Sequence, residues 1–273
     1  MPQKQWPSKI VTNVAVRSYS AKDLEAAIMD WPIRAGGSLI VHTALHTLGK
    51  PSGFAPADLP RILLELLRAK TGANGTIVVP TFNFGFCRGI PYDIRNTPVE
   101  GMGAFSEFVR KHQDAVRSHH AMQSVSALGP NAAAFLKADP ECAYADEGPF
   151  AELLELDATV LLIGPDFSAA SLIHRAEFVA GVPYRFIKKF EGTYVDLNGL
   201  SSTRTYTMHA RMKSPEPVLD LSHVDKWLKN DSTYARRPLF SGSVRMCSAR
   251  SLFNCIKLRL RNEPLSLLGN EWP

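Results

Sequence analysis

The sequence has few cysteines and no long apolar run. Its four cysteines, among 273 residues, form no C-x-x-C pair and no other short zinc-binding spacing. We therefore expect neither a disulfide framework nor a structural zinc site, and a reducing cytoplasm is the compartment that this cysteine usage favours. Apolar stretches such as TIVVP and ATVLLIG are of strand length, whereas a membrane-spanning helix needs roughly 20 residues. The opening MPQKQWPSK lacks the apolar segment of a secretory signal, so no membrane partner is predicted.

Several common catalytic motifs are also missing. The chain contains no G-x-S-x-G turn for a hydrolase serine, no G-x-x-x-x-G-K-[ST] phosphate loop and no G-x-G-x-x-G dinucleotide motif. Nucleotide hydrolysis and dinucleotide redox chemistry are therefore not expected.

The net charge of +5 indicates an anionic partner, such as nucleic acid, a phosphorylated small molecule or an acidic surface. The basic residues are spread along the chain apart from short groups such as KLRLR, and no nucleic-acid-binding motif accompanies them. We therefore expect small-molecule ligands and no nucleic acid.

Apolar strands alternate with amphipathic helices over the first two thirds of the chain. Near-continuous apolar strands are typical of a sheet covered on both faces, so we predict an α/β fold with a layered α/β/α mixed sheet. Ligands of such folds gather where strands end, which here means after Val41, Val79 and Ile163. The predicted strands are 38–45, 75–82, 124–129 and 158–166, and the predicted helices are 57–72, 103–112, 130–138, 150–157 and 168–181.

From about Tyr184 the pattern changes to shorter, more polar alternating stretches that are typical of antiparallel hairpins. This predicts a smaller β-rich C-terminal portion, with a subdomain at 184–240, followed by a closing helix at 248–263. Because the sequence has no repeat and no low-complexity linker, we expect residues 1–273 to form one unit.

One helical pair suits acid-base chemistry. His174 and Glu177 lie three residues apart, which places them on one face of a helix. A carboxylate beside an imidazole fixes its tautomer and raises its basicity, as a general base for an amine or hydroxyl requires. A metal site or a plain surface pair remains an alternative.

Three loops at predicted strand ends carry polar side chains. VHTALHTLG (41–49) offers backbone N–H groups that could hold an anion or a thioester carbonyl, or it is a simple turn with solvated histidines. VRSHHAMQSVSALGP (116–130) carries two adjacent histidines, and FNFGFCRGIPYD (82–93) could line a sugar-sized pocket or form an irregular surface loop.

Five motifs in a fixed order resemble the aminoglycoside 3-N-acetyltransferase family, whose members transfer an acyl group from coenzyme A to an amine. The motifs are HTALHTLG, GTIVVPTFNF, YDIRNTPVEGMGAFSEFVR, RSHHAMQSVSALGP and VLLIGPDFSAASLIHRAE, within residues 36 to 185, and SGSVRMCSARSLF (241–253) extends the likeness more faintly. The resemblance implies acetyl-CoA or another acyl-CoA as co-substrate, no metal, and direct transfer in a ternary complex. The pyrophosphate loop of the other large N-acetyltransferase superfamily is absent.

The resemblance also implies roles for individual residues. His174 matches the family histidine that we expect to act as base, oriented by Glu177 or by an acid from the C-terminal part such as Asp220. His120 is the implied site histidine of the Arg-Ser-x-His-Pro segment. In that segment Ala121 replaces the usual proline, and Gln123 stands where a second histidine is common. The expected coenzyme A-binding residues are Thr43, Ala44, Leu45, Gly49, Ser124 and Val125, with the 43–49 backbone or the Ser124 hydroxyl at the developing oxyanion.

The acceptor is expected to be an amino sugar, either an aminoglycoside or a nucleotide-linked amino sugar. A polycationic aminoglycoside calls for an acidic pocket, whereas the basic chain would suit an anionic acceptor. Asn83, Asp93 and Asp220 are the candidate acceptor-binding residues. The remaining alternatives for the function are a non-catalytic coenzyme A-binding protein and a metal-dependent hydrolase that uses His120, His174 and Glu177. A homo-oligomer is a possible assembly.

Overall fold

The computed structural model describes residues 16–272, so the opening MPQKQWPSK lies outside the described residues. Within the described part, no helix combines the length and the apolar character that crossing a bilayer requires.

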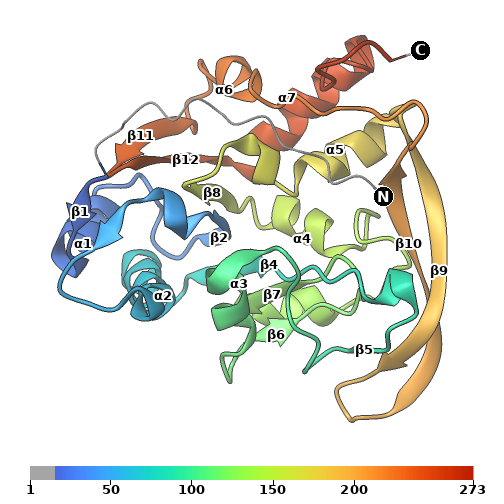
Figure 1. Ribbon diagram of the computed structural model, residues 1–273, viewed down its shortest axis with the longest axis horizontal. Coiled ribbons are helices and arrows are strands. Elements are labelled where there is room, and N and C mark those ends of the chain that lie inside the picture. Colours follow the sequence, from blue (N-terminus) through green and yellow to red (C-terminus); the bar gives the residue numbers. More distant parts are fainter. Residues whose placement is uncertain (1–15, 273) are drawn as a thin grey trace, which may run out of the picture.

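A seven-stranded mixed sheet forms the centre of the molecule (Figure 1). At its middle, β2 (Ser38–Thr43) pairs in parallel with β4 (Thr76–Pro80) on one side and with β8 (Thr159–Ile163) on the other. The outer strands are antiparallel, which confirms the predicted mixed sheet. They are β7 (Val125–Leu128) and β6 (Val116–Arg117) beyond β4, and β12 (Gly242–Ser248) and β11 (Ala235–Leu239) beyond β8.

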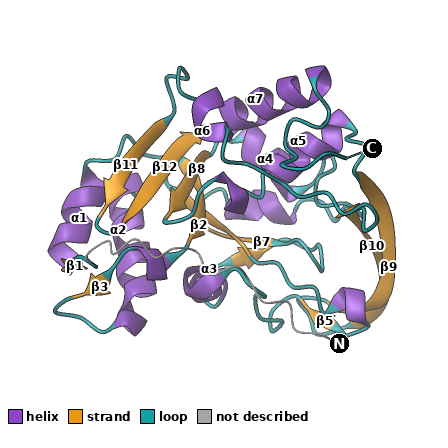
Figure 2. Ribbon diagram, turned by 45° about the horizontal axis from the view of Figure 1, so that its top comes forward, coloured by secondary structure: helices purple, strands orange, loops and turns teal. Residues whose placement is uncertain are grey.

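Helices cover both faces of this sheet, as the apolar strands predict (Figure 2). Alternate residues of β2 explain why: Leu39 and Val41 pack into one apolar cluster, and Ile40 packs into the other. The first cluster lies against α1 (Ala21–Met29), α2 (Leu59–Thr71) and α3 (Gly103–Arg110), and the second against α4 (Pro149–Glu155), α5 (Ile173–Ala180) and α7 (Ala249–Asn262).

Two predicted helices are shorter than the sequence suggests. The segment 130–138 forms only a 3-10 helix, Ala132–Leu136. In the segment 168–181, the Asp166 side chain caps a separate 3-10 turn, Phe167–Ala169, and Ala170 then turns extended, so α5 begins at Ile173. This break matters for the site because it directs Ser171 toward β2.

The β-rich portion divides between two sheets. A long ribbon of β9 (Arg185–Val195) and β10 (Ser201–Arg211) joins β5 (Tyr92–Asp93) in a separate three-stranded sheet, which curves along one side of the molecule (Figure 1). The rest of the predicted 184–240 portion contains the short helix α6 (Val224–Trp227) and β11, which with β12 extends the central sheet. Two short strands, β1 (Ser18–Tyr19) and β3 (Lys50–Pro51), form a small parallel pair.

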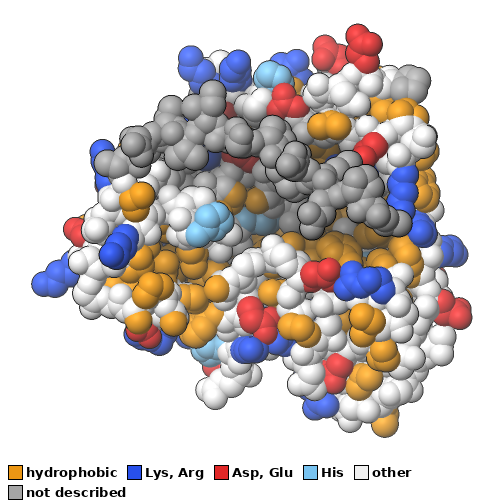
Figure 3. All heavy atoms as spheres, viewed as in Figure 1, with side chains coloured by type: hydrophobic (Ala, Val, Ile, Leu, Met, Phe, Trp, Pro, Cys, Tyr) orange, Lys and Arg blue, Asp and Glu red, His pale blue; other side chains and the backbone are white. Residues whose placement is uncertain are grey.

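Charged side chains of both signs are interspersed on the face shown in Figure 3. Such mixing is the ordinary condition of a solvated protein surface.

Candidate active site

A cavity of about 740 Å³ opens at the carboxyl ends of the three parallel strands. It receives His42 and Thr43 from the end of β2, Phe82 from the segment after β4, and Ser171 from the segment after β8. The cavity thus lies where the sequence pattern predicts that ligands gather, after Val41, Val79 and Ile163, because adjacent parallel strands end together there. The remaining lining residues are Pro80, Phe84, Gly101, Met102, Gln123, Ser168, Ala169, His174, Arg185, Met208, His209, Ala210, Arg211, Lys213, Leu219 and Leu221.

His174 and Glu177 form a short contact in this cavity. They lie one turn apart on α5, and His174 Nδ1 is 2.6 Å from Glu177 Oε2. The His174 side chain is partly exposed and lines the cavity, whereas Glu177 is fully buried behind it. If Nδ1 donates its proton to the carboxylate, Nε2 is left as a proton acceptor.

The Glu177 carboxylate is held in its charged form by its partners. Burial raises its pKa, but the charges and hydrogen bonds of His174 and Arg185 outweigh burial and lower the pKa to about 2. The Tyr184 hydroxyl donates to Oε1 at 3.0 Å, and the Arg185 guanidinium lies 2.9 Å from Oε2. The carboxylate is therefore ionised and fully hydrogen-bonded throughout the neutral pH range.

Arg185 approaches both members of the pair. Its Nη2 is 3.2 Å from His174 Nδ1 and 2.9 Å from Glu177 Oε2. A guanidinium can only donate, so its proton belongs to the carboxylate, since the 2.6 Å contact between Nδ1 and Oε2 needs a proton on Nδ1. The second arm of Arg185, Nη1, donates to the His209 carbonyl at 3.0 Å and ties β9 to β10 at the cavity wall.

His42 is a site residue that the sequence reasoning did not single out. The Ser171 main-chain N–H donates to His42 Nε2 at 3.3 Å, which leaves the ring proton on Nδ1. Burial, together with the charge of His174, lowers the pKa of His42 to about 4, so the ring is neutral at pH 7. Its position directly after Val41, at a predicted strand end, was the available signal.

Polar atoms without partners gather at the same cavity. His42 Nδ1, Gln123 Oε1, Arg185 Nε and His209 Nδ1 are all buried and make no hydrogen bond within the described residues. All four residues line the cavity. Because buried polar groups are rarely left unpaired, this concentration of unpaired atoms makes the cavity the candidate binding site.

His120 lies elsewhere. It is not among the cavity-lining residues, and its ring is buried, with Nε2 3.1 Å from the Thr207 carbonyl. Its Nδ1 accepts the main-chain N–H groups of Met122 and Gln123. Both ring nitrogens are thus occupied by backbone groups, which fix the turn that presents Gln123, and the geometry lends no support to the expected role of His120 at the reacting atoms.

Of the expected 43–49 loop, only Thr43 lines the cavity. The Ala44 N–H already donates to the Ile163 carbonyl at 2.9 Å, and Leu45 packs against the apolar core on the other side. Gly49 has φ +110°, and a Cβ there would lie 2.2 Å from the Arg17 carbonyl oxygen. Glycine is therefore needed for close packing of the loop on β1, and the expected ligand contacts of Ala44, Leu45 and Gly49 have no support in the geometry.

The Ser124 hydroxyl is also committed to the protein. It lies 3.0 Å from the Thr81 carbonyl, to which it donates, and it accepts from Arg117 Nε at 3.0 Å. Val125 is fully buried in β7, and its N–H donates to the Ser118 hydroxyl. Neither residue lines the cavity, so the geometry lends no support to the expected oxyanion and cofactor contacts of Ser124 and Val125.

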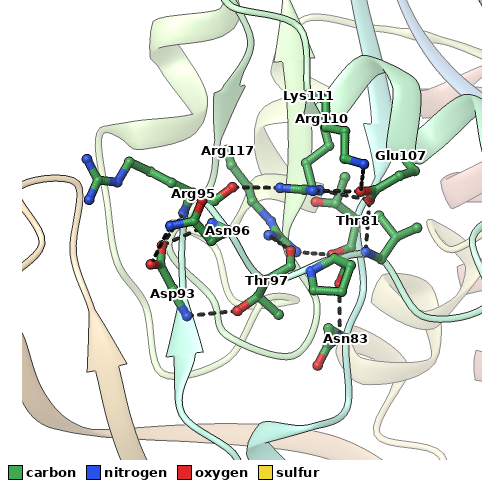
Figure 4. A network of polar contacts seen from close by, with 12 residues as sticks. Thr81, Asn83, Asp93, Arg95, Asn96, Thr97, Glu107, Arg110, Lys111 and Arg117 are labelled. Atoms are coloured by element: carbon green, nitrogen blue, oxygen red, sulfur yellow. Dashed lines mark hydrogen bonds and ion pairs between the residues drawn. The ribbon is translucent and has the colours of Figure 1, made fainter.

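Asn83 and Asp93 belong to a structural network around the buried Arg117 guanidinium (Figure 4). Arg117 donates to the carbonyls of Thr81 and Thr97, both at 2.6 Å. The Asn83 amide donates to the Pro98 carbonyl, and the Asp93 carboxylate accepts the N–H groups of residues 95 and 96. These side chains fold the 82–100 loop and do not line the cavity, so an acceptor-binding role for Asn83 and Asp93 has no geometric support.

Asp220 lies beside the cavity without lining it. Its neighbours Leu219 and Leu221 are lining residues, while the Asp220 carboxylate accepts the Ser222 N–H at 2.9 Å and stands 3.6 Å from His223. The hydrogen bond from Ser222 lowers the pKa of Asp220. The structure therefore does not bring Asp220 to His174 as an orienting acid; Glu177 fills that position.

The metal-dependent alternative lacks a suitable site. Residues 16–272 contain no group of three His, Cys, Asp or Glu side chains that could hold a metal ion. His120 does not share the cavity of His174, as the hydrolase hypothesis needed.

Comparison with known proteins gives one consistent family. Residues 40–261 match the family model described as aminoglycoside 3-N-acetyltransferase. Aminoglycoside N(3)-acetyltransferase IV of Salmonella sp is 26% identical over 255 residues, covering 90% of this chain and 89% of that protein. Aminoglycoside N(3)-acetyltransferase IX of Micromonospora chalcea is 25% identical and covers 80% of this chain and 81% of its own.

Solved structures share the fold. The aminoglycoside acetyltransferase AAC(3)-Xa superposes with a TM-score of 0.76 at 21% identity, covering 93% of this chain and 95% of that one. AAC-IIIb in a binary complex with CoASH superposes with a TM-score of 0.74 at 19% identity, covering 94% of this chain and 100% of that one.

Proposed function

Because the chain belongs to the aminoglycoside 3-N-acetyltransferase family, we propose that it transfers an acyl group from acetyl-CoA, or a related acyl-CoA, to an amino group of an amino sugar, with His174 as general base. Family membership makes it a coenzyme A-dependent N-acyltransferase. The observation that carries the assignment of His174 is its 2.6 Å contact with the buried Glu177 at a cavity formed by three strand ends.

His174 receives the amine proton in this proposal. Glu177 fixes the proton on Nδ1, so Nε2 has the free lone pair that accepts a proton from the attacking amine. As the N–C bond forms and the C–S bond breaks, the proton held on Nε2 passes to the departing thiolate, and charge balances over the cycle. Because none of these reaction steps requires an acyl-enzyme intermediate, double-reciprocal plots of initial velocity for the two substrates should intersect. Parallel lines would contradict direct transfer.

The residues of the cavity fit an acyl thioester. When bound, acetyl-CoA supplies a thioester carbonyl whose oxygen becomes negative as the amine attacks. His42 is the best candidate to donate to that oxygen, because its ring is neutral, its proton is on Nδ1, and Nδ1 has no partner among the described residues. A neutral, fixed donor stabilises developing charge without the cost of reorganising water. This replaces the Ser124 hydroxyl, which is occupied.

The test is the release of free coenzyme A by the His174→Ala variant. We expect turnover to fall by about 10²- to 10⁴-fold, the range that a general base contributes, while calorimetric affinity for coenzyme A stays within about twofold. His46→Ala is the matched control, since His46 is an exposed histidine in the turn after β2 and does not line the cavity. Unchanged turnover in His174→Ala would remove His174 from the role, and turnover of any amine by the parent enzyme would exclude the non-catalytic alternative.

A further inference from the structure

The charge of the cavity has a single sign. Three cationic side chains, Arg185, Arg211 and Lys213, line it, and no Asp or Glu of residues 16–272 does. The first fifteen residues of the sequence contain no Asp or Glu either, so that segment has no carboxylate to add.

The nearest carboxylate on α5 is not available to a ligand. Glu177 is fully buried and already accepts from Tyr184 and contacts both His174 and Arg185. The positive charge of Arg185 is therefore largely compensated. Arg211 and Lys213, in contrast, are exposed at the end of β10 and make no ion pair with any described residue.

We propose that the acceptor amine also carries an anionic group, a phosphate or a carboxylate, and that Arg211 and Lys213 bind this group at the mouth of the cavity. The inference rests on the proposed function and specifies its acceptor. An uncompensated cationic pair attracts an anion and repels a polycation, and this effect acts on both encounter rate and affinity. Guanidinium and ammonium groups are the usual protein donors to phosphate and carboxylate oxygens.

The same cavity also suits the uncharged part of such an acceptor. Phe82, Phe84 and Met102 line it, and aromatic and thioether side chains pack against the faces of sugar rings and bases. An amino sugar that bears a phosphate thus finds an apolar wall, a base for its amine and a cationic mouth within one cavity of about 740 Å³.

Calorimetry with a matched pair of probes tests the proposal directly. Glucosamine 6-phosphate and glucosamine differ only by the phosphate, and both are titrated into the protein with coenzyme A at saturation, so that cationic groups used by the phosphates of coenzyme A are already occupied. We expect the phosphorylated probe to bind at least tenfold more tightly. Equal affinity for the two probes would overturn the proposal.

Charge reversal locates the site. The double variant Arg211→Glu, Lys213→Glu should lose the preference for glucosamine 6-phosphate, while its affinity for coenzyme A changes less than its affinity for the probe. Lys22→Glu, Arg34→Glu is the matched control, because it makes the same change in net charge at exposed residues outside the cavity. Equal loss in both double variants, or a loss confined to coenzyme A binding, would contradict an acceptor site at Arg211 and Lys213.

Turnover measurements distinguish failure of the anionic-acceptor proposal from failure of acyl transfer. If aminoglycosides are acylated faster than glucosamine 6-phosphate and a nucleotide-linked amino sugar, and charge reversal at Arg211 and Lys213 does not alter that order, the anionic acceptor is refuted while acyl transfer stands. If coenzyme A binds but no amine of any charge is acylated, acyl transfer itself fails, and the calorimetric preference still decides whether the anion site exists.

Discussion

Replacing Glu177 by Gln removes one negative charge from a buried group of four residues. The amide can keep its oxygen toward His174 and Arg185 and can donate its NH₂ to the Tyr184 hydroxyl, since a hydroxyl both donates and accepts. The shape of the site is therefore retained, and the substitution tests charge. Glu177 acts through His174, so it is a positioning residue.

The expected cost follows from the pKa of Glu177. The carboxyl pKa falls from 4.5 to about 2 on folding, and a shift of that size corresponds to about 3 kcal/mol in favour of the charged form. Glu177→Gln should lower the free energy of unfolding by about that amount at neutral pH, because it also leaves the Arg185 guanidinium buried without its counter-charge. The contribution of a carboxyl with a lowered pKa is present above its unfolded pKa and is lost as the pH falls from about 4.5 through about 2.

Activity should fall further than stability explains. The amide oxygen still accepts from Nδ1, but without its charge it no longer stabilises the imidazolium that forms when His174 takes the amine proton, and we expect turnover to drop by about 10²- to 10³-fold with the KM for acetyl-CoA nearly unchanged. The assays are urea unfolding and mass-detected release of coenzyme A at a temperature where the variant is folded.

Glu107→Gln is the matched control. Glu107 is also paired with an arginine three residues away, Arg110, and hydrogen bonds from its partners outweigh burial and lower its pKa to about 2. Glu107 lies outside the cavity, so Glu107→Gln should lower the free energy of unfolding without changing turnover. A folded Glu177→Gln enzyme with turnover within twofold of the parent would refute the positioning role.

Two further predictions concern stability. Gly49→Ala should lower the free energy of unfolding by about 2–5 kcal/mol, because the new Cβ meets both a positive φ and overlap with the main chain. Gly53→Ala is the control: it has a positive φ but nothing within 4 Å, and should lower the free energy of unfolding by only about 1–2 kcal/mol. Equal losses in the two variants would show that the overlap at Gly49 is relieved. Burial lowers the pKa of His42 and His120 to about 4 in the folded protein. The unfolded chain therefore binds more protons than the folded one as the pH falls below about 6.5. The free energy of unfolding should then fall by about 2 kcal/mol per histidine between about pH 6.5 and 5. Urea unfolding across this range checks the slope, with His46→Gln as the exposed control, and a flat profile would contradict the burial argument.

Pattern in the sequence predicts much of this fold because the signals are local. Apolar residues in near-continuous runs predict the buried strands, and helices such as α2 and α7 begin and end at residues with clear local roles, Gly72 and Ser248 among them. The same locality explains the prediction of His174 with Glu177, since a spacing of three residues on a helix sets their contact without reference to the rest of the chain.

The expected roles of His120, Ser124, Asn83 and Asp93 depended on information that the sequence lacks. Each of these side chains lies at or near a strand end, as a site residue would, yet each makes hydrogen bonds to backbone or side-chain groups of the loops around it. Whether a polar side chain at a strand end faces a ligand or its own loop depends on the partners that folding brings to it.

The sequence by itself determined the layered α/β architecture, the edge of the sheet at which the cavity opens, and the helical His174–Glu177 pair, because these follow from periodicity and short spacing. Only the tertiary structure decided which groups share the cavity with them. Ser171 meets His42 across 129 positions, and the β9–β10 ribbon brings Arg185, Arg211 and Lys213 to strand ends formed far earlier in the chain. Such contacts, and the single sign of charge they create, arise from packing between distant segments, which no local pattern encodes.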